Sequence, residues 1–335
     1  MGNHTAGQWV VAAACLCGLL SGECLAGRII AWGRNEVGQC NAPAGDDFVA
    51  VSAGFRHALA LREDGTVEAW GHNGAGRCDV PDEGPYVAVA AGGYHSLAVT
   101  GLGTLVAWGA NNLGQCNVPL GDDYVAVLAG EYHSFAQKVN GKWIGWGQNN
   151  NGEIGIPGSL ASDVLSCTGH HTVALNANGT ITAWGRNKQK ECNPPANAFF
   201  AAVAAGESFT VGVLGYGRLA AWGKTAYRLL EVPAGFDFVD VFAGNNHALA
   251  VRADGSVVGW GLNKYGQCNA PAGWEFEYIS LGREFSLGLE AQPGSICTRA
   301  LVGDLDQDCR VDLRDLALML ENWLQCNLSR PEDCW

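Results

Sequence analysis

A Trp-Gly pair returns along this chain at a fixed interval of 38 residues. Repeats of about 20 to 50 residues are typical of arrays, solenoids and propellers, in which each unit buries its hydrophobic face against the next one. The 335 residues could hold two ordinary domains, but an unbroken repeat predicts one large repeat domain instead. The pairs begin at Trp32, Trp70, Trp108, Trp146, Trp184, Trp222 and Trp260, without an insertion or deletion between them.

One period contains three runs of residues that favour β-strands, as in YVAVLAGEYHSFAQKVNGKWIGWGQNNNGEIGIP from Tyr124. A Gly turn separates VAVLAG from HSFAQKV, and Asn-Gly, a strong hairpin signal, joins HSFAQKV to KWIGWG. The chain must then return to its starting side, so a short fourth strand is expected after Trp-Gly. Seven such sheets stacked around an axis cover one another, which predicts an all-β, seven-bladed β-propeller of 38-residue blades.

The two ends of the repeat region, residues 27–294, predict that terminal strands close the propeller. The hairpin glycine recurs from Gly65 to Gly255, and one period before Gly65 it falls on Gly27. The region therefore begins at a third strand, RIIAWG, whereas YISLG and FSLGLEAQPG, the first two strands of that blade, come only at the end. Joining the ends completes the blade, while an open solenoid would leave two unpaired edges.

The repeat AGGYHSLAVTGLGTLVAWGANNLGQ, from Ala91, resembles that of the regulator-of-chromosome-condensation propeller family, and the resemblance covers residues 27 to 293. The short, even period is most similar to bacterial members, including secreted propeller inhibitors of β-lactamase. The resemblance implies seven blades and binding through loops. It does not identify the ligand, because one fold serves many functions.

Two residue types recur at fixed places in the blades. The histidine position also accepts Phe209 and Phe285, so it is expected to be a packing site with a hydrogen-bonded imidazole. Equivalent atoms of separate blades also lie too far apart to share a metal ion. The cysteine position also accepts Ile154 and Leu230, which predicts buried free thiols. These residues are His57, His95, His133, His171 and His247, and Cys40, Cys78, Cys116, Cys192 and Cys268.

The N-terminus predicts export. The apolar run WVVAAACLCGLL, residues 9–20, is too short to span a bilayer, and small residues follow it at Cys24 and Ala26. Residues 1–26 are therefore predicted to be a signal peptide of a secreted or cell-envelope protein of bacterial type, with a buried N-terminal segment as the alternative. A net charge of −13 without a Lys/Arg run argues against nucleic acid and membrane insertion or binding.

One face of the propeller is expected to differ from blade to blade. The Gly-x-x-His turn and the loop after Trp-Gly emerge on it, and they carry Tyr and Arg, which are enriched at the energetic centres of protein interfaces. Unselected drift of these turns is the alternative. The opposite face is acidic, with Asp46, Asp47, Asp64, Asp82, Glu83, Asp122, Asp123, Asp237 and Asp254. The candidate binding residues are Phe55, Arg56, Tyr94, Tyr132, Tyr227, Tyr265 and Arg283.

No Ser-His-Asp arrangement, phosphate-binding loop or separate carboxylate pair stands apart from the repeat. The chain is therefore predicted to be a secreted, non-enzymatic protein that binds another protein through this variable face. The alternative is a carbohydrate-binding or carbohydrate-active module, with Trp and Tyr rings stacking on sugars. A Trp beside Gly in every unit is better explained as a wedge between blades.

The C-terminal segment, residues 295–335, predicts a calcium loop followed by a helix. It resembles half of a type I dockerin, but Cys309 replaces the usual Gly at position 6 and no second loop follows. Calcium binding is therefore expected more than docking to a cohesin, and a solvated acidic turn is the alternative. Four cysteines of this tail, Cys297, Cys309, Cys326 and Cys334, could form two disulfides of unknown connectivity. Counted from Asp304, the ligand positions hold Asp304, Asp306, Asp308, Arg310 (through its carbonyl), Asp312 and Asp315, and the apolar helix positions hold Leu313, Leu316, Leu320, Trp323 and Leu324.

Overall fold

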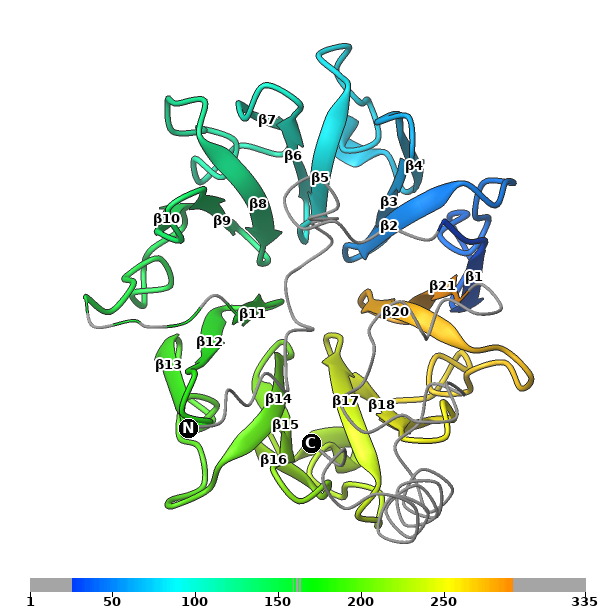
Figure 1. Cartoon of the computed structure of the whole chain (residues 1–335), viewed down its shortest axis with the longest axis vertical. Helices are drawn as coiled ribbons and strands as arrows, with labels where there is room; N and C mark the ends of the chain where they lie inside the picture. Colours follow the sequence, from blue (N-terminus) through cyan, green and yellow to red (C-terminus); the bar gives the residue numbers. More distant parts are fainter. Residues whose placement is uncertain (1–25, 159, 161, 163, 292–335) are drawn as a thin grey trace, which may run out of the picture.

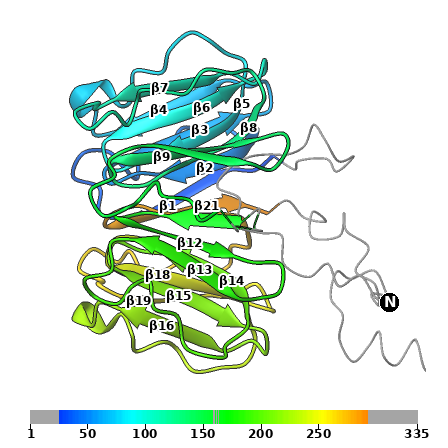
Figure 2. The same ribbon diagram turned by 90° about the vertical axis from the view of Figure 1, so that its left-hand side faces the viewer.

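A computed structural model describes residues 26–158, 160, 162 and 164–291, which form a ring of seven antiparallel sheets (Figure 1). Each sheet is a blade with an inner, a middle and an outer strand, and the inner strands converge on the centre of the ring. Figure 2 shows the blades from the side, with their strands running between the two faces of the ring. The predicted all-β architecture of seven blades is confirmed for these residues.

Blades 1 to 6 each use consecutive strands, whereas blade 7 combines the two ends of the described chain. Two single-turn 3₁₀ helices, η1 (Gly74–Gly76) and η2 (Ala226–Arg228), lie in loops after outer strands. No helix in the described ranges is long and apolar enough to cross a membrane. The blades are β2 (Phe48–Ala53), β3 (His57–Arg62) and β4 (Val67–Gly71); β5 (Tyr86–Ala91), β6 (His95–Thr100) and β7 (Leu105–Gly109); β8 (Tyr124–Ala129), β9 (His133–Lys138) and β10 (Trp143–Gly147); β11 (Val164–Cys167), β12 (His171–Leu175) and β13 (Ile181–Gly185); β14 (Phe200–Ala205), β15 (Phe209–Leu214) and β16 (Leu219–Gly223); β17 (Phe238–Ala243), β18 (His247–Arg252) and β19 (Val257–Gly261); and β20 (Phe276–Leu281), β21 (Phe285–Glu290) and β1 (Ile29–Gly33).

The predicted closure of the ring is confirmed. Strand β1 pairs antiparallel with β21, from Ile29 opposite Leu289 to Gly33 opposite Phe285. Next to this ladder, the Arg28 guanidinium donates to both carboxylate oxygens of Glu290, at 2.7 and 3.0 Å. Blade 7 therefore has all three of its strands, and the described ring has no open blade edge where its ends meet.

The predicted short fourth strand is wrong, because every described blade has three strands. In the loop after β1, the Asn35 side chain accepts a hydrogen bond from the Cys40 N–H at 2.9 Å and donates one to the Asn41 side chain at 2.8 Å. The Asn35 side chain thus bonds a backbone N–H that a fourth strand would have to pair. The same two bonds form in the loops that begin at Asn73, Asn111, Asn187 and Asn263.

The repeat cysteines lie in these loops as free thiols, as predicted, but Cys268 alone among the five is buried and the others are half-buried. The Cys40 thiol donates to the Arg34 carbonyl at 3.1 Å, which keeps it inside the loop. Burial raises the pKa of Cys40 to about 11, so the thiol stays protonated at neutral pH.

The Trp-Gly pair joins neighbouring blades, which explains its recurrence. Each of the seven Trp indoles donates to a backbone carbonyl of the preceding blade; the Trp108 indole reaches the Arg77 oxygen at 2.9 Å. The glycine that follows each Trp has φ between 93° and 108°, a region that other residues avoid. A Cβ at Gly71 would also lie 2.6 Å from the Arg56 carbonyl oxygen.

The repeat histidines make a second link between blades. The His95 Nε2–H donates to the Ser134 hydroxyl of the next blade at 2.9 Å, and that hydroxyl donates to the Gln115 carbonyl at 2.9 Å. Equivalent bonds join His57 to Ser96, His171 to Thr210 and His247 to Ser286, whereas His133 and Thr172 are buried without such a bond among the described residues. Where a blade has Phe209 or Phe285 instead, the next blade has Ala248 or Ala58. His with Ser or Thr, and Phe with Ala, are therefore two alternative residue pairs that fill the same contact between adjacent blades.

This complementarity predicts a strong coupling between His95 and Ser134. We expect His95→Phe and Ser134→Ala each to destabilise the fold by about 1 to 3 kcal/mol, because one overpacks the contact and the other leaves a buried N–H without an acceptor. The double variant reproduces the Phe209/Ala248 pair and should recover most of the loss. Urea unfolding of all four proteins measures the coupling, and strictly additive losses would contradict it.

The hydrophobic core lies between the blades rather than inside any one of them. Seven clusters of described residues each join two adjacent blades, and the cluster between blades 7 and 1 contains Ile29, Phe48 and Phe285. A single blade cannot bury both of its faces, so stability depends on completing the ring.

Candidate binding face

The turns between inner and middle strands lie at the same end of the blades as the loops after the outer strands. In blade 1, His57 pairs with Gly71, so the turn before His57 and the loop after Gly71 emerge together. We call this end the turn face and the opposite end, with the hairpins between middle and outer strands, the hairpin face. All seven candidate binding residues belong to the turn face.

The turn face carries an arc of ring contacts across blades 1 to 4, of which the first is edge-to-face and the other two are stacked. Phe55 packs against Tyr94 with ring centroids 5.4 Å apart, Tyr94 against Tyr132 at 5.0 Å, and Tyr132 against His170 at 6.3 Å. The Arg283 guanidinium, from blade 7, lies 5.9 Å from the centre of the Phe55 ring. We call these five residues the aromatic arc. Phe55 is only 6% exposed, so within the arc it packs against its neighbours and offers little surface itself.

Charged groups hold the arc in place. His170 Nε2 lies 3.1 Å from a Glu131 carboxylate oxygen, and this hydrogen bond raises the pKa of His170. Burial raises the pKa of Tyr132, and the Arg77 guanidinium lies 5.2 Å from the centre of the Tyr94 ring.

Arg77 and His170 are not among the candidates named from the sequence. Repeat comparison could have indicated Arg77, because three other blades have Gln at its position.

Tyr227 and Tyr265 lie apart from the arc, on the loops after β16 and β19. Tyr265 lies between two cations, with the Arg34 guanidinium and the Lys264 ammonium each 5.0 Å from its ring centre. Tyr227 is 48% exposed, and the Lys224 ammonium lies 5.3 Å from its ring centre. Neither ring contacts the arc among the described residues. The structure therefore forms one continuous arc and two separate Tyr–cation sites on the same face.

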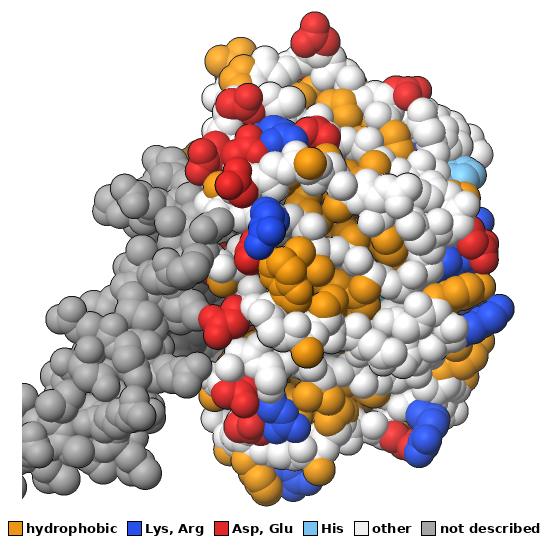
Figure 3. All heavy atoms as spheres, turned by 90° about the vertical axis from the view of Figure 1, so that its right-hand side faces the viewer, with side chains coloured by type: hydrophobic (Ala, Val, Ile, Leu, Met, Phe, Trp, Pro, Cys, Tyr) orange, Lys and Arg blue, Asp and Glu red, His pale blue; other side chains and the backbone are white. Residues whose placement is uncertain are grey.

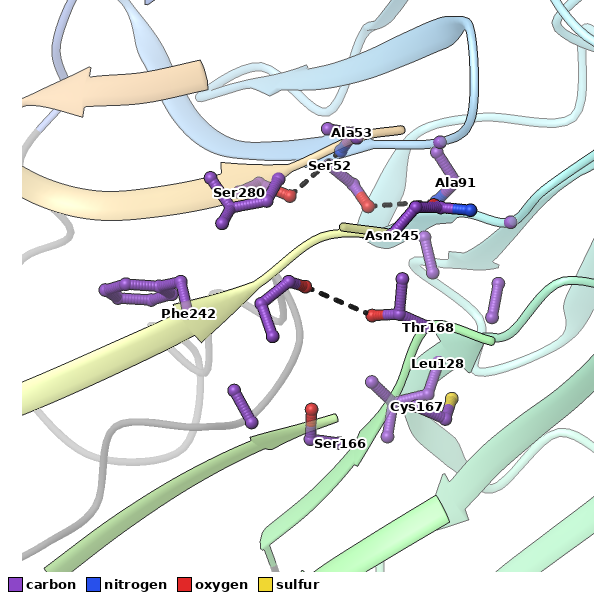
Figure 4. Close-up of a pocket in the computed structure, with 18 of the residues that line it drawn as sticks. Ser52, Ala53, Ala91, Leu128, Ser166, Cys167, Thr168, Phe242, Asn245 and Ser280 are labelled. Carbon is purple, nitrogen blue, oxygen red and sulfur yellow. Dashed lines mark hydrogen bonds between the residues drawn. The ribbon is translucent and has the colours of Figure 1, made fainter. Parts of the chain in front are cut away.

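A small cavity lies on the axis, where the inner strands converge (Figure 4). The hydroxyls of Ser52 and Ser280 accept backbone N–H bonds from neighbouring blades at 2.9 Å, and the Asn245 side-chain oxygen, in a residue only 2% exposed, has no described hydrogen-bond partner. The cavity measures about 100 Å³, room for about three water molecules, whereas ligand pockets usually measure about 300 to 1,000 Å³. It is therefore too small to be a substrate pocket of ordinary size.

Side chains of the hairpin face pair with one another and with rings. Arg62 pairs with Asp47, and its guanidinium lies 4.1 Å from the centre of the Phe48 ring. Lys138 with Asp123, and Arg252 with Asp237, repeat this arrangement in blades 3 and 6. Figure 3, viewed from the side of β1 and β2, shows acidic side chains gathered along one rim. The predicted acidic face is thus partly neutralised within the blades.

Several sequence-based expectations fall outside the described residues. These are the signal peptide, the calcium ligands from Asp304 to Asp315, the dockerin-like segment and the four tail cysteines. Within the described ranges, no group of three or more His, Cys, Asp and Glu side chains is arranged to hold a metal ion.

Comparisons with known proteins agree with the geometry. Three repeats, residues 48–77, 86–115 and 238–267, match the Regulator of chromosome condensation (RCC1) repeat. No curated protein matches the chain. Human WBSCR16 has a similar structure, with a TM-score of 0.67 and 15% identity over 79% of this chain and 100% of that one.

Two further structures extend this likeness. Prp20p from Saccharomyces cerevisiae, described with its binding to Gsp1p and histones, has a TM-score of 0.67 and 17% identity, covering 82% of this chain and 94% of that chain. The ectodomain of the Arabidopsis thaliana receptor kinase ACR4 has a TM-score of 0.60 and 21% identity, covering 74% of this chain and 93% of that chain. Identities this low establish the fold alone. The matching repeats and the shared architecture together make the chain an RCC1-like β-propeller.

Proposed function

We propose that this protein is a non-enzymatic binding protein whose turn face recognises a protein partner. The observation that carries the proposal is the aromatic arc, in which Arg283, Phe55, Tyr94, Tyr132 and His170 form one row across five adjacent blades. Tyr and Arg dominate the energetic centres of protein interfaces because they combine a large apolar area with polar groups. An RCC1-like propeller also suggests a protein-binding role.

The arc is held in place before any partner binds. Tyr94 and Tyr132 stack nearly parallel, at 18°, and Glu131 fixes His170 from the neighbouring blade. Side chains that are already ordered lose less conformational entropy on binding, so more of the contact energy appears as affinity. The arc thus has a cation, Arg283, at one end and the Glu131–His170 pair at the other.

The test is capture of partners from extracellular fractions by wild type and by Arg56→Ala/Tyr132→Ala/Arg283→Ala. We expect the triple variant to lose its partner, because it removes a ring and two cations from the turn face. Leu102→Ala/Leu120→Ala/Lys142→Ala, on the hairpin face, is the matched control and should retain the partner. If the turn-face variant retains every partner, the face is assigned incorrectly.

Carbohydrate binding is the competing function. Six of the seven repeat tryptophans are only 7% to 9% exposed, because they pack between neighbouring blades. They therefore offer no platform for sugar rings. Tyr227 and Tyr265 would have to supply that platform. Binding on a glycan array that Tyr227→Ala/Tyr265→Ala removes would favour the carbohydrate function over the protein-binding one.

We also propose that the protein is exported and that its C-terminal loop binds calcium, both from the sequence pattern. We expect calcium titration of the full chain to release heat at millimolar calcium, because Asp304, Asp306, Asp308, Asp312 and Asp315 supply hard oxygen ligands. Isothermal calorimetry measures this, with Asp304→Ala/Asp315→Ala as the variant that should lose it. Equal titrations of variant and wild type would contradict the calcium site.

A further inference from the structure

Three aromatic side chains lie exposed on the hairpin face, at the junction of blades 5 and 6. Phe199 is 63% exposed, Tyr216 60% and Phe236 71%. Their backbone segments adjoin, because the Gly215 N–H donates to the Phe199 carbonyl at 2.9 Å and the Phe238 N–H to the Gly217 carbonyl at 3.1 Å. We call Phe199, Tyr216 and Phe236 the hairpin-face aromatic patch.

The other blades show that this patch is a departure from the repeat. Exposed apolar clusters of this kind mark interaction sites, since water contact with them is unfavourable. The three exposed rings gathered on a largely acidic face are therefore a candidate docking site. Other blades place Asp47, Asp123, Asp237 and Glu275 at the position of Phe199, residues that include Asp64, Leu102 and Asp254 at that of Tyr216, and residues that include Asp46, Asp122 and Trp274 at that of Phe236.

The chain itself supplies an occupant on this same face. Strand β21 ends at Glu290 on the hairpin face, in blade 7, which is the neighbour of blade 6. Residues 292–335 follow, and their apolar residues recur at helical spacing from Leu313 to Leu324. An extended linker of residues 292–312 could reach about 70 Å at about 3.3 Å per residue, far enough for blades 5 and 6.

Charge favours the same occupant. Arg218 is exposed beside the patch, with its guanidinium 5.1 Å from the centre of the Phe236 ring. It has no ion-pair partner among the described residues, whereas the apolar stretch of the tail carries Glu321, which is not one of the proposed calcium ligands. We propose that residues 313–324 dock on the hairpin-face aromatic patch through Leu313, Leu316, Leu320, Trp323 and Leu324, with Arg218 pairing with Glu321.

Hydrogen exchange of the full chain in millimolar calcium, read by mass spectrometry, tests this contact. Residues 313–324 should be protected in wild type, and Phe199→Ser/Phe236→Ser should speed their exchange by about tenfold or more. Leu102→Ser/Leu120→Ser is the matched control, because these side chains are 83% and 97% exposed on the same face in blades 2 and 3. It should leave the exchange of residues 313–324 unchanged.

The reciprocal change should uncover the patch. Leu316→Asp/Trp323→Asp should increase binding of an apolar fluorescent dye, and adding Phe199→Ser/Phe236→Ser should abolish that increase. Both variants alter residues outside the propeller core, so unchanged urea unfolding verifies the fold. The proposal is overturned if residues 313–324 exchange freely in wild type, if the patch and control variants behave alike, or if protection disappears on dilution, which would identify a second copy as the occupant.

Discussion

Deletion of residues 27–33 is expected to prevent the ring from forming and to leave an aggregating protein. These residues include β1, the outer strand of blade 7, and Trp32, whose indole donates to the Gln267 carbonyl of blade 6 at 3.0 Å. Loss of the buried Trp32 and Ile29 side chains alone should cost about 3 to 5 and about 2 to 5 kcal/mol. That sum is comparable to the total stability of a typical domain, about 5 to 15 kcal/mol.

The deletion also uncovers the backbone of β21, and an unpaired strand edge promotes association. Light scattering after gel filtration and urea unfolding measure both effects. Arg28→Ala is the matched control, because its side chain is 56% exposed and an exposed ion pair such as the one with Glu290 contributes little to stability. A deletion variant that stays monomeric with wild-type unfolding would show that closure does not stabilise the ring.

Acidification should unfold the protein between about pH 6.5 and pH 4, before most exposed carboxylates are protonated. Burial lowers the pKa of His57, His95, His171 and His247 to about 3 and that of His133 to about 4. In the unfolded chain these imidazoles take up protons near pH 6.5, while the folded ring keeps them neutral. The unfolded state therefore binds more protons in this window, and stability present above about pH 6.5 is lost as the pH falls.

Each histidine should contribute up to about 1.4 kcal/mol per pH unit within the window. Three described groups act in the opposite direction: burial raises the pKa of Asp240 to about 7 and also raises that of Glu277, and the hydrogen bond to Glu131 raises that of His170. Five buried histidines outweigh these three. Urea unfolding across the pH range measures the slope of stability against pH.

The variant His57→Phe/Ser96→Ala is the matched control for acid unfolding. It copies the Phe/Ala pairs of other blades, so it should keep the contact while removing one titrating group. The slope of stability against pH should then fall by about one proton. An unchanged slope would mean that His57 does not contribute to acid unfolding.

The sequence by itself determined the number of blades, their strand order and the closure of the ring. Because the 38-residue period is unbroken, the strands begin at equivalent positions in every blade. A strand identified in one repeat therefore identifies its equivalents in the others. The Trp-Gly pair could be interpreted as a contact between blades because a large ring and a glycine, which can adopt a positive φ, recur together in every repeat. Because the hairpin glycine recurs at Gly27, the repeat region begins at the third strand of a blade. The pairing of that strand with one about 250 positions later follows from this.

The tertiary structure alone decided which repeat positions reach one another and which reach solvent. The loop after Trp-Gly contains no fourth strand because Asn35 and its equivalents bond the loop internally. Phe55, which packs against Tyr94 of the next blade, is buried, whereas the equally apolar Phe236 is 71% exposed. The physical reason is that periodicity specifies the backbone path of each blade, whereas burial depends on side chains of the neighbouring blade, as when Tyr94 packs against Phe55.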